Sequence, residues 1–241
     1  MKNLKSTKEK EKERFIKMKD YSKLSEITIK SQTELDEIPQ NFKGRIYIDC
    51  GPNDWIKIRH NYYYPVVVKG NSSVVVCVFP PVVNDFPDFP TVEAHENSSI
   101  VVNGYSSIKA YGQSSVEAYQ FSSVEAFDHS SVRAFDMSRV RVYEEASAVL
   151  FDDSSAKAFD MSRVKAFQHS SVRAYDMSSI EAFDFSSVGA FDKSSVEAWE
   201  FAAIRAYHDS SIKANGNTQV VDFVQGAKIE VFENARRVYG I

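Results

Sequence analysis

Acidic side chains recur at near-constant spacing along the second half of this 241-residue chain. Each directly follows an aromatic residue, and the carboxylates are Asp128, Asp136, Glu144, Asp152, Asp160, Asp176, Asp184, Asp192 and Glu200. Such rows could imitate the phosphates of a nucleic acid or gather cations. They could also cap turns, because an Asp side chain readily accepts a backbone N–H two residues on. Capping accounts for Gln120 and Gln168 at the same position, and a capping carboxylate still carries its charge, so we take the nine acids as candidate partner-binding residues.

Catalytic signatures do not accompany these acids. The histidines lack metal-ligand spacing: His60, His95, His129, His169 and His208. The paired serines are interpreted as turn residues, and none lies in a glycine-flanked nucleophile elbow or a phosphate-cradling loop. The sequence therefore predicts a protein that is not an enzyme, with no catalytic, cofactor-binding or metal-binding residues.

A basic segment opens the chain. Residues 1–24 carry a net charge of +5, which leaves about −9 for the rest of a chain whose total is −4. Basic clusters attract phosphate, so a nucleic-acid or membrane-surface arm is one interpretation. Acids interleaved at Glu9, Glu11 and Glu13 favour a solvated, partly helical or disordered leader instead. The candidate arm residues are Lys8, Lys10, Lys12, Arg14, Lys17 and Lys19.

The acids belong to an octapeptide repeat. Seventeen positions eight residues apart, from Val92 to Val220, hold an aliphatic residue or alanine. In the copy that begins at Ser122, Val124 and Ala126 are two residues apart and point to one face of an extended segment, with Glu125 opposite. Eight residues are too few for a helical repeat, which needs roughly 30 or more. Each unit is therefore predicted to be one strand and one turn.

Two or three such units could close a coil, and the charges help to decide. With sixteen residues per coil, the charged strand positions give six neighbours of opposite sign and three of like sign; with twenty-four they give four of each. Opposite charges on paired strands stabilise a sheet. The residues before alternate serine pairs are also more apolar in one set, which suggests a partly covered edge of a two-sided coil: Tyr105, Phe121, Met137, Asp153, His169, Phe185, Phe201 and Asn217. We predict an all-β fold, a parallel β-solenoid (β-helix) with about 16 residues per coil.

An aromatic column runs through thirteen consecutive units, from Tyr111 to Tyr207. If the strand runs straight through this position, the rings face solvent and form a large sticky surface. If the chain bends there, the rings turn inward, fill the corners left by the alanines and stack as ladders. The inward arrangement is the one we favour on physical grounds.

The repeat sets the expected domain limits: a leader over 1–24, a cap with irregular strands over 25–65, the solenoid over 66–228 and a final cap strand over 229–241. The cap is expected to hold a strand at 27–29 and a helical turn or two at 33–38, with Thr33 as the helix cap. Two cysteines on different strand-like segments, Cys50 and Cys77, favour a reducing compartment. Without a membrane-length apolar run or a signal-peptide core, we expect a cytoplasmic protein without a membrane partner.

The unit Ser-Ser-Val-x-Ala-aromatic resembles that of uncharacterised bacterial and phage octapeptide-repeat proteins, often preceded by a segment like residues 35–48. The likeness covers about residues 33–240, and it implies a setting in the cytoplasm of a bacterial host cell. Here Phe or Tyr followed by Asp stands where the group has Trp or Arg followed by Gly-Asn, which makes this rod more acidic. The group brings no activity to carry over.

Two functions follow as expectations. The first is a non-catalytic rod that presents a rigid acidic face to a protein partner, either a host protein or a second copy in a homo-oligomer. The alternative is an inhibitor of a host nucleic-acid-processing defence enzyme, similar to an anti-CRISPR protein, that acts by nucleic-acid mimicry or steric blocking. Mimicry of nucleic acid is a better fit to an acidic rod than binding of nucleic acid.

Overall fold

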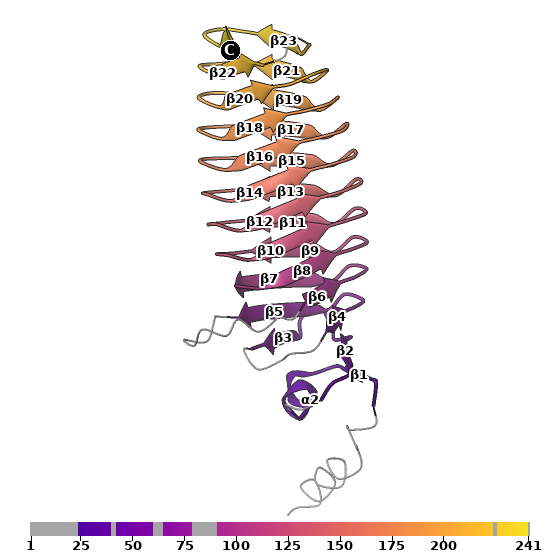
Figure 1. The fold of residues 1–241 in the computed structure, drawn as a ribbon. Helices are drawn as coiled ribbons and strands as arrows, with labels where there is room; N and C mark the ends of the chain where they lie inside the picture. The colour runs from indigo at the N-terminus through magenta and orange to yellow at the C-terminus, as the bar shows by residue number, and fades with distance from the viewer. Residues whose placement is uncertain (1–23, 40–41, 60–64, 79–90, 224–225, 241) are drawn as a thin grey trace, which may run out of the picture.

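The structure is a computed structural model, and it describes residues 24–39, 42–59, 65–78, 91–223 and 226–240. The chain winds into a rod of stacked coils, in which the strands form two parallel sheets on opposite sides and the turns project along the two long edges (Figure 1). One sheet has 13 strands and holds β1 and the even-numbered strands, and the other has 11 and holds the remaining odd-numbered strands. The all-β parallel solenoid is confirmed.

The elements of the first part of the rod are β1 (Glu26–Ile29), α2 (Gln32–Asp36), β2 (Arg45–Ile48), β3 (Trp55–Ile58), β4 (Val66–Val68), β5 (Ser73–Val78), β6 (Thr91–Ala94), β7 (Ser99–Gly104), β8 (Ser107–Ala110), β9 (Ser115–Ala118), β10 (Ser123–Ala126) and β11 (Ser131–Ala134). The second part holds β12 (Arg139–Val142), β13 (Ser147–Leu150), β14 (Ser155–Ala158), β15 (Arg163–Ala166), β16 (Ser171–Ala174), β17 (Ser179–Ala182), β18 (Ser187–Ala190), β19 (Ser195–Ala198), β20 (Ala203–Ala206), β21 (Ser211–Ala214), β22 (Gln219–Asp222), β23 (Lys228–Val231) and β24 (Arg236–Tyr239).

The register confirms two octapeptides per coil. On the 13-stranded sheet Val124 lies beside Val140, and on the 11-stranded sheet Val132 lies beside Ala148, sixteen residues along in both cases. Each residue therefore has its equivalents directly above and below it, at the strand spacing of about 4.8 Å. A property that recurs every sixteen residues becomes a straight row along the rod.

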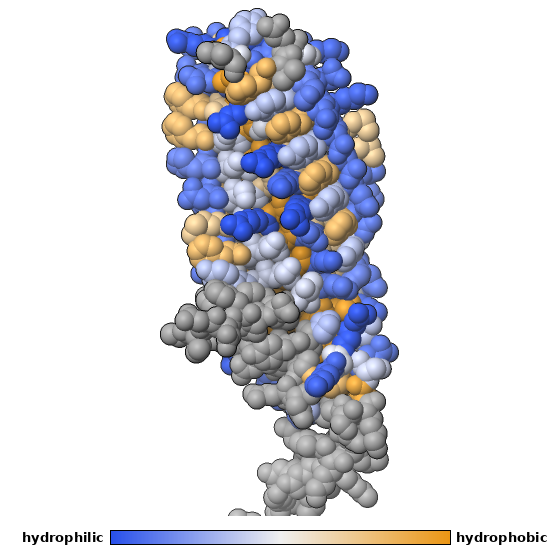
Figure 2. Space-filling model, in the orientation of Figure 1, coloured by the Kyte–Doolittle hydropathy of each residue, from blue (hydrophilic) through white to orange (hydrophobic). Residues whose placement is uncertain are grey.

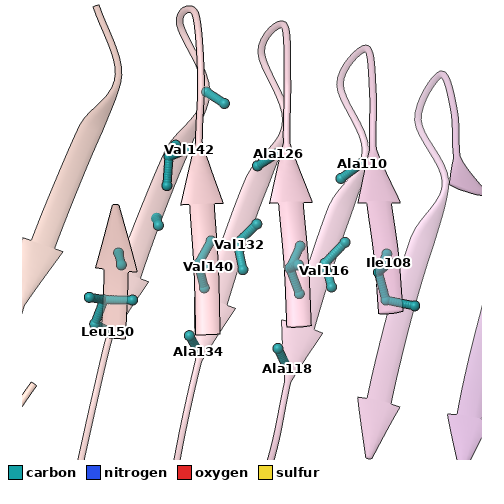
Figure 3. Close-up of a cluster of buried hydrophobic side chains, with 14 of the residues drawn as sticks. Ile108, Ala110, Val116, Ala118, Ala126, Val132, Ala134, Val140, Val142 and Leu150 are labelled. Carbon is teal, nitrogen blue, oxygen red and sulfur yellow. The ribbon is translucent and has the colours of Figure 1, made fainter. Parts of the chain in front are cut away.

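The core lies between the two sheets. The aliphatic and alanine positions alternate with outward-facing residues and are fully buried, as Val116, Ala118, Val132 and Ala134 show in Figure 3. Removing such an aliphatic side chain from water contributes about 1.5–3 kcal/mol. The core residues of each coil are buried by those of the coils above and below it. The stack is therefore stable as an array, and a single coil would not be stable alone.

The two serines of each pair have different places. The first is buried at the corner: Ser122 and Ser130 are inaccessible to solvent, and their Oγ atoms donate to the carbonyls of Tyr119 and Phe127, 2.9 and 2.7 Å away. The second, such as Ser123, begins the strand and faces outward. The interpretation of both serines as turn residues is therefore wrong for the second, because the strand begins one residue earlier than the aliphatic position.

The ends depart from the repeat. The expected strand at 27–29 is β1, but α2 is capped by Ser31, whose Oγ accepts from the backbone N–H of Glu34 at 3.3 Å, and the predicted cap Thr33 lies inside the helix. At the other end, within the final cap strand expected over 229–241, the structure has two strands. β23 pairs with β21 one residue out of phase with the repeat, and β24, which was not expected, pairs with β22. There the Arg237 guanidinium donates to the buried carboxylate of Asp222 at 2.6 Å. This hydrogen bond raises the pKa of Arg237 above its ordinary value.

Candidate functional site

The predicted partner-binding acids lie on the two long edges of the rod. Edge 1 is made by the turns that follow even-numbered strands, and five of the acids occupy successive coils there: Asp128, Glu144, Asp160, Asp176 and Asp192. Edge 2 is made by the turns that follow odd-numbered strands, and it holds the remaining four: Asp136, Asp152, Asp184 and Glu200. The structure thus separates the nine residues into two rows on opposite sides of the molecule.

Each acidic position has left-handed backbone geometry. The φ angle is 57° at Asp128 and 56° at Asp136, and Gly112 and Gly216 take the same place in the turn with φ of 66° and 64°. Asp tolerates this conformation better than most residues, and glycine adopts it without cost. The turn therefore restricts the position to a few residue types before any partner is considered.

The carboxylates bond to the preceding coil. The backbone N–H of Gly112 donates to Asp128 Oδ2 at 2.8 Å, and the N–H of Asp128 donates in turn to Glu144 Oε2 at 2.8 Å, sixteen residues further on. On edge 2 the N–H of Gln120 donates to Asp136 Oδ2 at 3.1 Å, and the N–H of Asp152 to Gln168 Oε1 at 2.7 Å. The acids therefore form hydrogen-bonded ladders along the edges.

These ladders correct the capping prediction. The acids satisfy backbone donors, but the donors belong to the equivalent turn one coil earlier and not to the serine pair of the same turn. The reason is geometric. In the parallel stack, the residue with left-handed backbone geometry in one turn lies directly beneath its equivalent in the next coil, so its N–H faces that residue's side chain. A glutamine amide oxygen can accept the same bond, which explains Gln168. Eight of the nine acids take part in the ladders, each through one carboxylate oxygen, and the described hydrogen bonds do not include one to Asp192. The acids remain exposed except for Asp184, which is half-buried.

The aromatic column forms two stacked ladders outside the core. Along edge 1, Phe127 and Tyr143 stack at 5.0 Å between ring centroids, with an interplanar angle of 5°; along edge 2, Phe167 and Phe183 stack at 4.8 Å and 6°. The rings are half-buried, and none belongs to the buried core. The preferred inward arrangement is therefore wrong, while the stacking is confirmed. The rings cover one another's faces, so their outward position does not create the sticky surface that argued against it.

One phenol is tuned by this environment. Tyr119 directly follows β9, and its hydroxyl donates to Oε2 of Glu117 on that strand at 3.3 Å. Burial and the nearby Glu117 carboxylate raise the pKa of Tyr119 above its ordinary value.

Exposed hydrophobic side chains accompany the acids at the turns, and Figure 2 shows hydrophobic patches along both long edges. On edge 2, Phe121 is 45% exposed and Phe185 and Phe201 are 59% and 55% exposed. Phe185 and Phe201 stack at 5.3 Å. The set that we expected to be partly covered is therefore largely open to solvent, and it gives edge 2 a mixed acidic and aromatic surface.

A pocket interrupts edge 2 near the C-terminal end. Trp199 stacks on Phe183 at 4.7 Å, but the next coil places Asn215 above Trp199 and Asn217 above Phe201. The two aromatic rows of edge 2, that of Trp199 and that of Phe201, therefore end there. The pocket of about 460 Å³ lies among these residues, with Glu200 and Glu233 at its border. Aromatic faces beside carboxylates suit a cationic group such as a guanidinium or an ammonium. In the sequence, Asn215-Gly216-Asn217 marks the position of this pocket, because it replaces the aromatic, the acidic and the variable residue of one unit.

The outer faces of the sheets carry the alternating charges. Ion pairs join residues one coil apart: Lys109–Glu125 at 3.9 Å, Arg141–Glu125 at 2.8 Å, Arg133–Glu117 at 3.6 Å, Lys165–Glu181 at 2.9 Å and Lys213–Glu197 at 3.5 Å. These are contacts that the charge pattern predicted for a sixteen-residue coil. Exposed pairs of this kind contribute little stability, about 0–1 kcal/mol each, but they set the local charge of each face.

The candidate basic arm, Lys8 to Lys19, lies outside the described residues. Across the parts of the chain that the structure describes, no three His, Cys, Asp or Glu side chains converge as ligands for a metal ion. Within those same parts, no helix has the length and hydrophobicity needed to cross a membrane.

Comparison of the chain with protein-family models, with curated proteins and with solved structures found no match. The resemblance to bacterial and phage octapeptide-repeat proteins therefore stays a prediction.

Proposed function

We propose that the chain is a non-catalytic interaction protein that presents an acidic edge of the rod to a basic surface of a protein partner. The observation that supports this proposal best is the ladder of carboxylates along the edges. Eight of the nine acids accept a hydrogen bond from a backbone N–H of the preceding coil, as Asp128 does from Gly112 at 2.8 Å. The ladder spaces the charges at one coil, about 4.8 Å, without any need for a partner to order them. A rigid row of like charges steers an oppositely charged partner and fixes its register.

Edge 2 offers more than charge. Phe185 and Phe201 are exposed beside Asp184 and Glu200, and the pocket at Trp199 lies at the end of the same row. Aromatic residues are typical of the well-packed centre of protein interfaces, with charged residues at the rim. We therefore place the main contact on edge 2, with an Arg or Lys side chain of the partner at Trp199.

The test uses substitutions that keep the ladder intact. Asp136, Asp152 and Asp184 are changed together to Asn, whose side-chain oxygen still accepts the backbone N–H. The matched control changes Glu144 to Gln and Asp160 and Asp176 to Asn on edge 1. Binding of a labelled octa-arginine peptide is followed by fluorescence anisotropy at low salt. At about 0.5 kcal/mol for each exposed charge, the edge 2 triple variant should bind about tenfold more weakly.

The control decides the location. A loss confined to the edge 2 variant supports the contact described above, whereas an equal loss in both variants means that total charge alone governs binding. Unchanged binding in both variants would contradict the proposal. Circular dichroism of each variant checks that the β-structure is retained.

The second candidate is inhibition of a nucleic-acid-processing enzyme by mimicry, which is favoured by two straight rows of carboxylates on opposite edges, like the two phosphate rows of a duplex. Reversal of charge at Asp136, Asp152 and Asp184 should abolish inhibition of a nuclease that the protein inhibits. A shape-driven block would survive the same change, so an unchanged inhibitory titre eliminates mimicry.

A further inference from the structure

The outer face of the 13-stranded sheet changes character midway along the rod. Up to β12 the charges alternate, and Glu125 lies between Lys109 and Arg141 with an ion pair to each. Beyond β12 the alternation stops, because Arg141 is followed in register by Lys157 on β14 and Arg173 on β16. Three cations therefore occupy one row on three adjacent strands.

A fourth cation widens this row. Arg139 precedes Arg141 by two residues on β12, so both side chains point outward from the same strand, and both are exposed. Among the residues that the structure describes, no carboxylate lies within ion-pair distance of Arg139, Lys157 or Arg173. Like charges directly opposite each other on paired strands destabilise a sheet. The fold thus leaves a positive strip in which three of the four cations have no carboxylate partner, on a chain with a net charge of −4.

A groove lies in this strip. It has a volume of about 420 Å³, its sides include Arg139, Arg141, Lys157 and Arg173, and the hydroxyl-bearing Ser155 and Ser171 also line it. It extends from β10 to β16, which is three coil steps, or about 14 Å. Long cationic side chains around short hydroxyl side chains are suited to an oxyanion, because guanidinium and hydroxyl groups both donate to it.

We propose that this groove binds a linear chain of phosphate groups, such as an oligophosphate or the backbone of a single nucleic-acid strand. The cations are spread over three adjacent strands, so a ligand needs several charges in a row to meet them all. Phosphate suits the arginines, since the planar guanidinium bonds to two of its oxygens at once.

The surroundings limit the shape of the ligand. The strands of the strip lead into the edge 1 acids Glu144, Asp160 and Asp176, and they follow the edge 2 acids Asp136 and Asp152. The strip is therefore a narrow basic band between two acidic rows. A single chain of phosphates fits within the band, whereas a duplex would bring its second strand against one of the acidic edges.

The neighbouring aromatic ladder does not add base recognition. Tyr143, Phe159 and Tyr175 follow the strands of the strip, but they stack on one another at 5.0 and 5.2 Å, so their faces are occupied. Proteins that read single strands by stacking need open ring faces. The groove should therefore bind through the phosphate groups alone, without preference for base sequence and with strong dependence on salt.

The experiment measures binding of inorganic tripolyphosphate by calorimetry, and of labelled single-stranded and duplex thymine-containing oligonucleotides by anisotropy. The groove variant combines Lys157→Gln and Arg173→Gln, and the matched control combines Lys165→Gln and Lys213→Gln, which removes two paired cations from the opposite sheet. We expect tripolyphosphate to bind the wild-type protein and the control variant with affinities that agree within about twofold. The groove variant should bind at least tenfold more weakly. The midpoint temperature of thermal unfolding of the unliganded groove variant should not be lower than that of the wild type, because the substitutions remove repulsion between neighbouring cations.

The arms distinguish the sources. If the protein binds both tripolyphosphate and the single strand, the groove recognises phosphate charge in general. If it binds the single strand but not tripolyphosphate, the groove recognises a phosphodiester backbone. Absence of both at low salt overturns the proposal, as does preference for the duplex or an equal loss in both variants. Self-association that the groove variant abolishes also overturns it, because the groove would then hold an acidic edge of a second copy. The edge 2 variant used above should bind tripolyphosphate normally, so failure of the proposed protein contact would leave this result unaffected.

Discussion

The carboxylate of Asp128 accepts a hydrogen bond from the backbone N–H of Gly112, 2.8 Å away and sixteen residues earlier in the chain. This bond joins equivalent turns of successive coils, and the same relationship links Gln120 with Asp136 at 3.1 Å on the other edge. The acids therefore have a structural task and an available charge at once. A test of their role has to separate the two.

Substitutions at Asp128 make this separation. Asn keeps both the acceptor and the tolerance for a left-handed backbone, so Asp128→Asn should match the wild type in urea unfolding. Asp128→Gly loses only the bond and should cost about 1 kcal/mol. Asp128→Ala loses the bond and adds the strain of a left-handed alanine, for about 2 kcal/mol in all. Hydrogen exchange at the Gly112 amide should be faster in the Gly and Ala variants, and unchanged protection there would contradict the ladder.

The aromatic ladders should contribute to stability although they lie outside the core. Phe151 stacks on Phe135 at 5.0 Å and on Phe167 at 5.4 Å. Phe151→Ala removes two stacked pairs, at about 1 kcal/mol each, and should lower the free energy of unfolding by about 2 kcal/mol. Phe151→Tyr serves as the control and should be neutral, because Tyr119 occupies the same position of the same ladder two coils earlier. Equal stability of the Ala and Tyr variants would show that the rings do not support the stack.

The buried serines should divide into two groups. Ser130 Oγ donates to the Phe127 carbonyl at 2.7 Å, whereas the buried Oγ of Ser138 has no hydrogen-bond partner. Ser130→Ala should cost about 1 kcal/mol, and Ser138→Ala should be neutral or stabilising, because it removes an unsatisfied buried hydroxyl. The natural alanines Ala146 and Ala202 at equivalent corners show that the smaller residue is accommodated. Denaturant unfolding of the two variants compares them, and a larger loss for Ser138→Ala would contradict the assignment.

The last coil should depend on the buried Asp222 carboxylate and its partner Arg237, 2.6 Å apart. Arg237→Gln leaves that carboxylate without its charged donor, so β24 should detach from β22 more readily. Amide exchange at Gly240, whose N–H donates to the Asp222 carbonyl at 2.8 Å, should accelerate. Arg236→Gln is the control, since its side chain makes no such bond, and equal acceleration in both variants would argue against a specific lock.

Much of the fold was predictable because the octapeptide repeats without a phase slip. The alternation of Val124 and Ala126 with Glu125 determines which side faces the core, and the charge pattern favours the sixteen-residue register that places Glu125 beside Arg141. Steric and electrostatic preferences favour the same arrangement in every unit, so a wrong interpretation of one residue does not change the predicted fold. The cap at Ser31 was missed because Thr33 is an equally good capping residue two positions on, and only the path of the chain distinguishes them.

The candidate site was predicted in composition but not in geometry. The nine acids form rows on two edges, and all except the half-buried Asp184 are exposed. Their hydrogen bonds, however, run between coils, and a bond of this kind has no signature within a single unit. The outward aromatic ladder was missed for the same reason, because the rings lose their exposed faces only to rings sixteen residues away. The groove at Lys157 and Arg173 could be identified only once the register was known, together with the absence of carboxylate partners for these cations among the described residues.

The stacking of residues sixteen apart underlies the ladders, the groove and both proposals, and engineered disulfides test it directly. In a background with Cys50 and Cys77 changed to Ser, cysteines at Ser171 and Ser187 should form an intramolecular disulfide on mild oxidation, because these residues are paired neighbours on β16 and β18. Cysteines at Ser171 and Ser195 should not, because Ser195 pairs with Ser179 on the opposite sheet. Non-reducing electrophoresis and peptide mass analysis distinguish the products. Efficient cross-linking of 171 with 195 and none of 171 with 187 would mean a coil of twenty-four residues and would contradict the account.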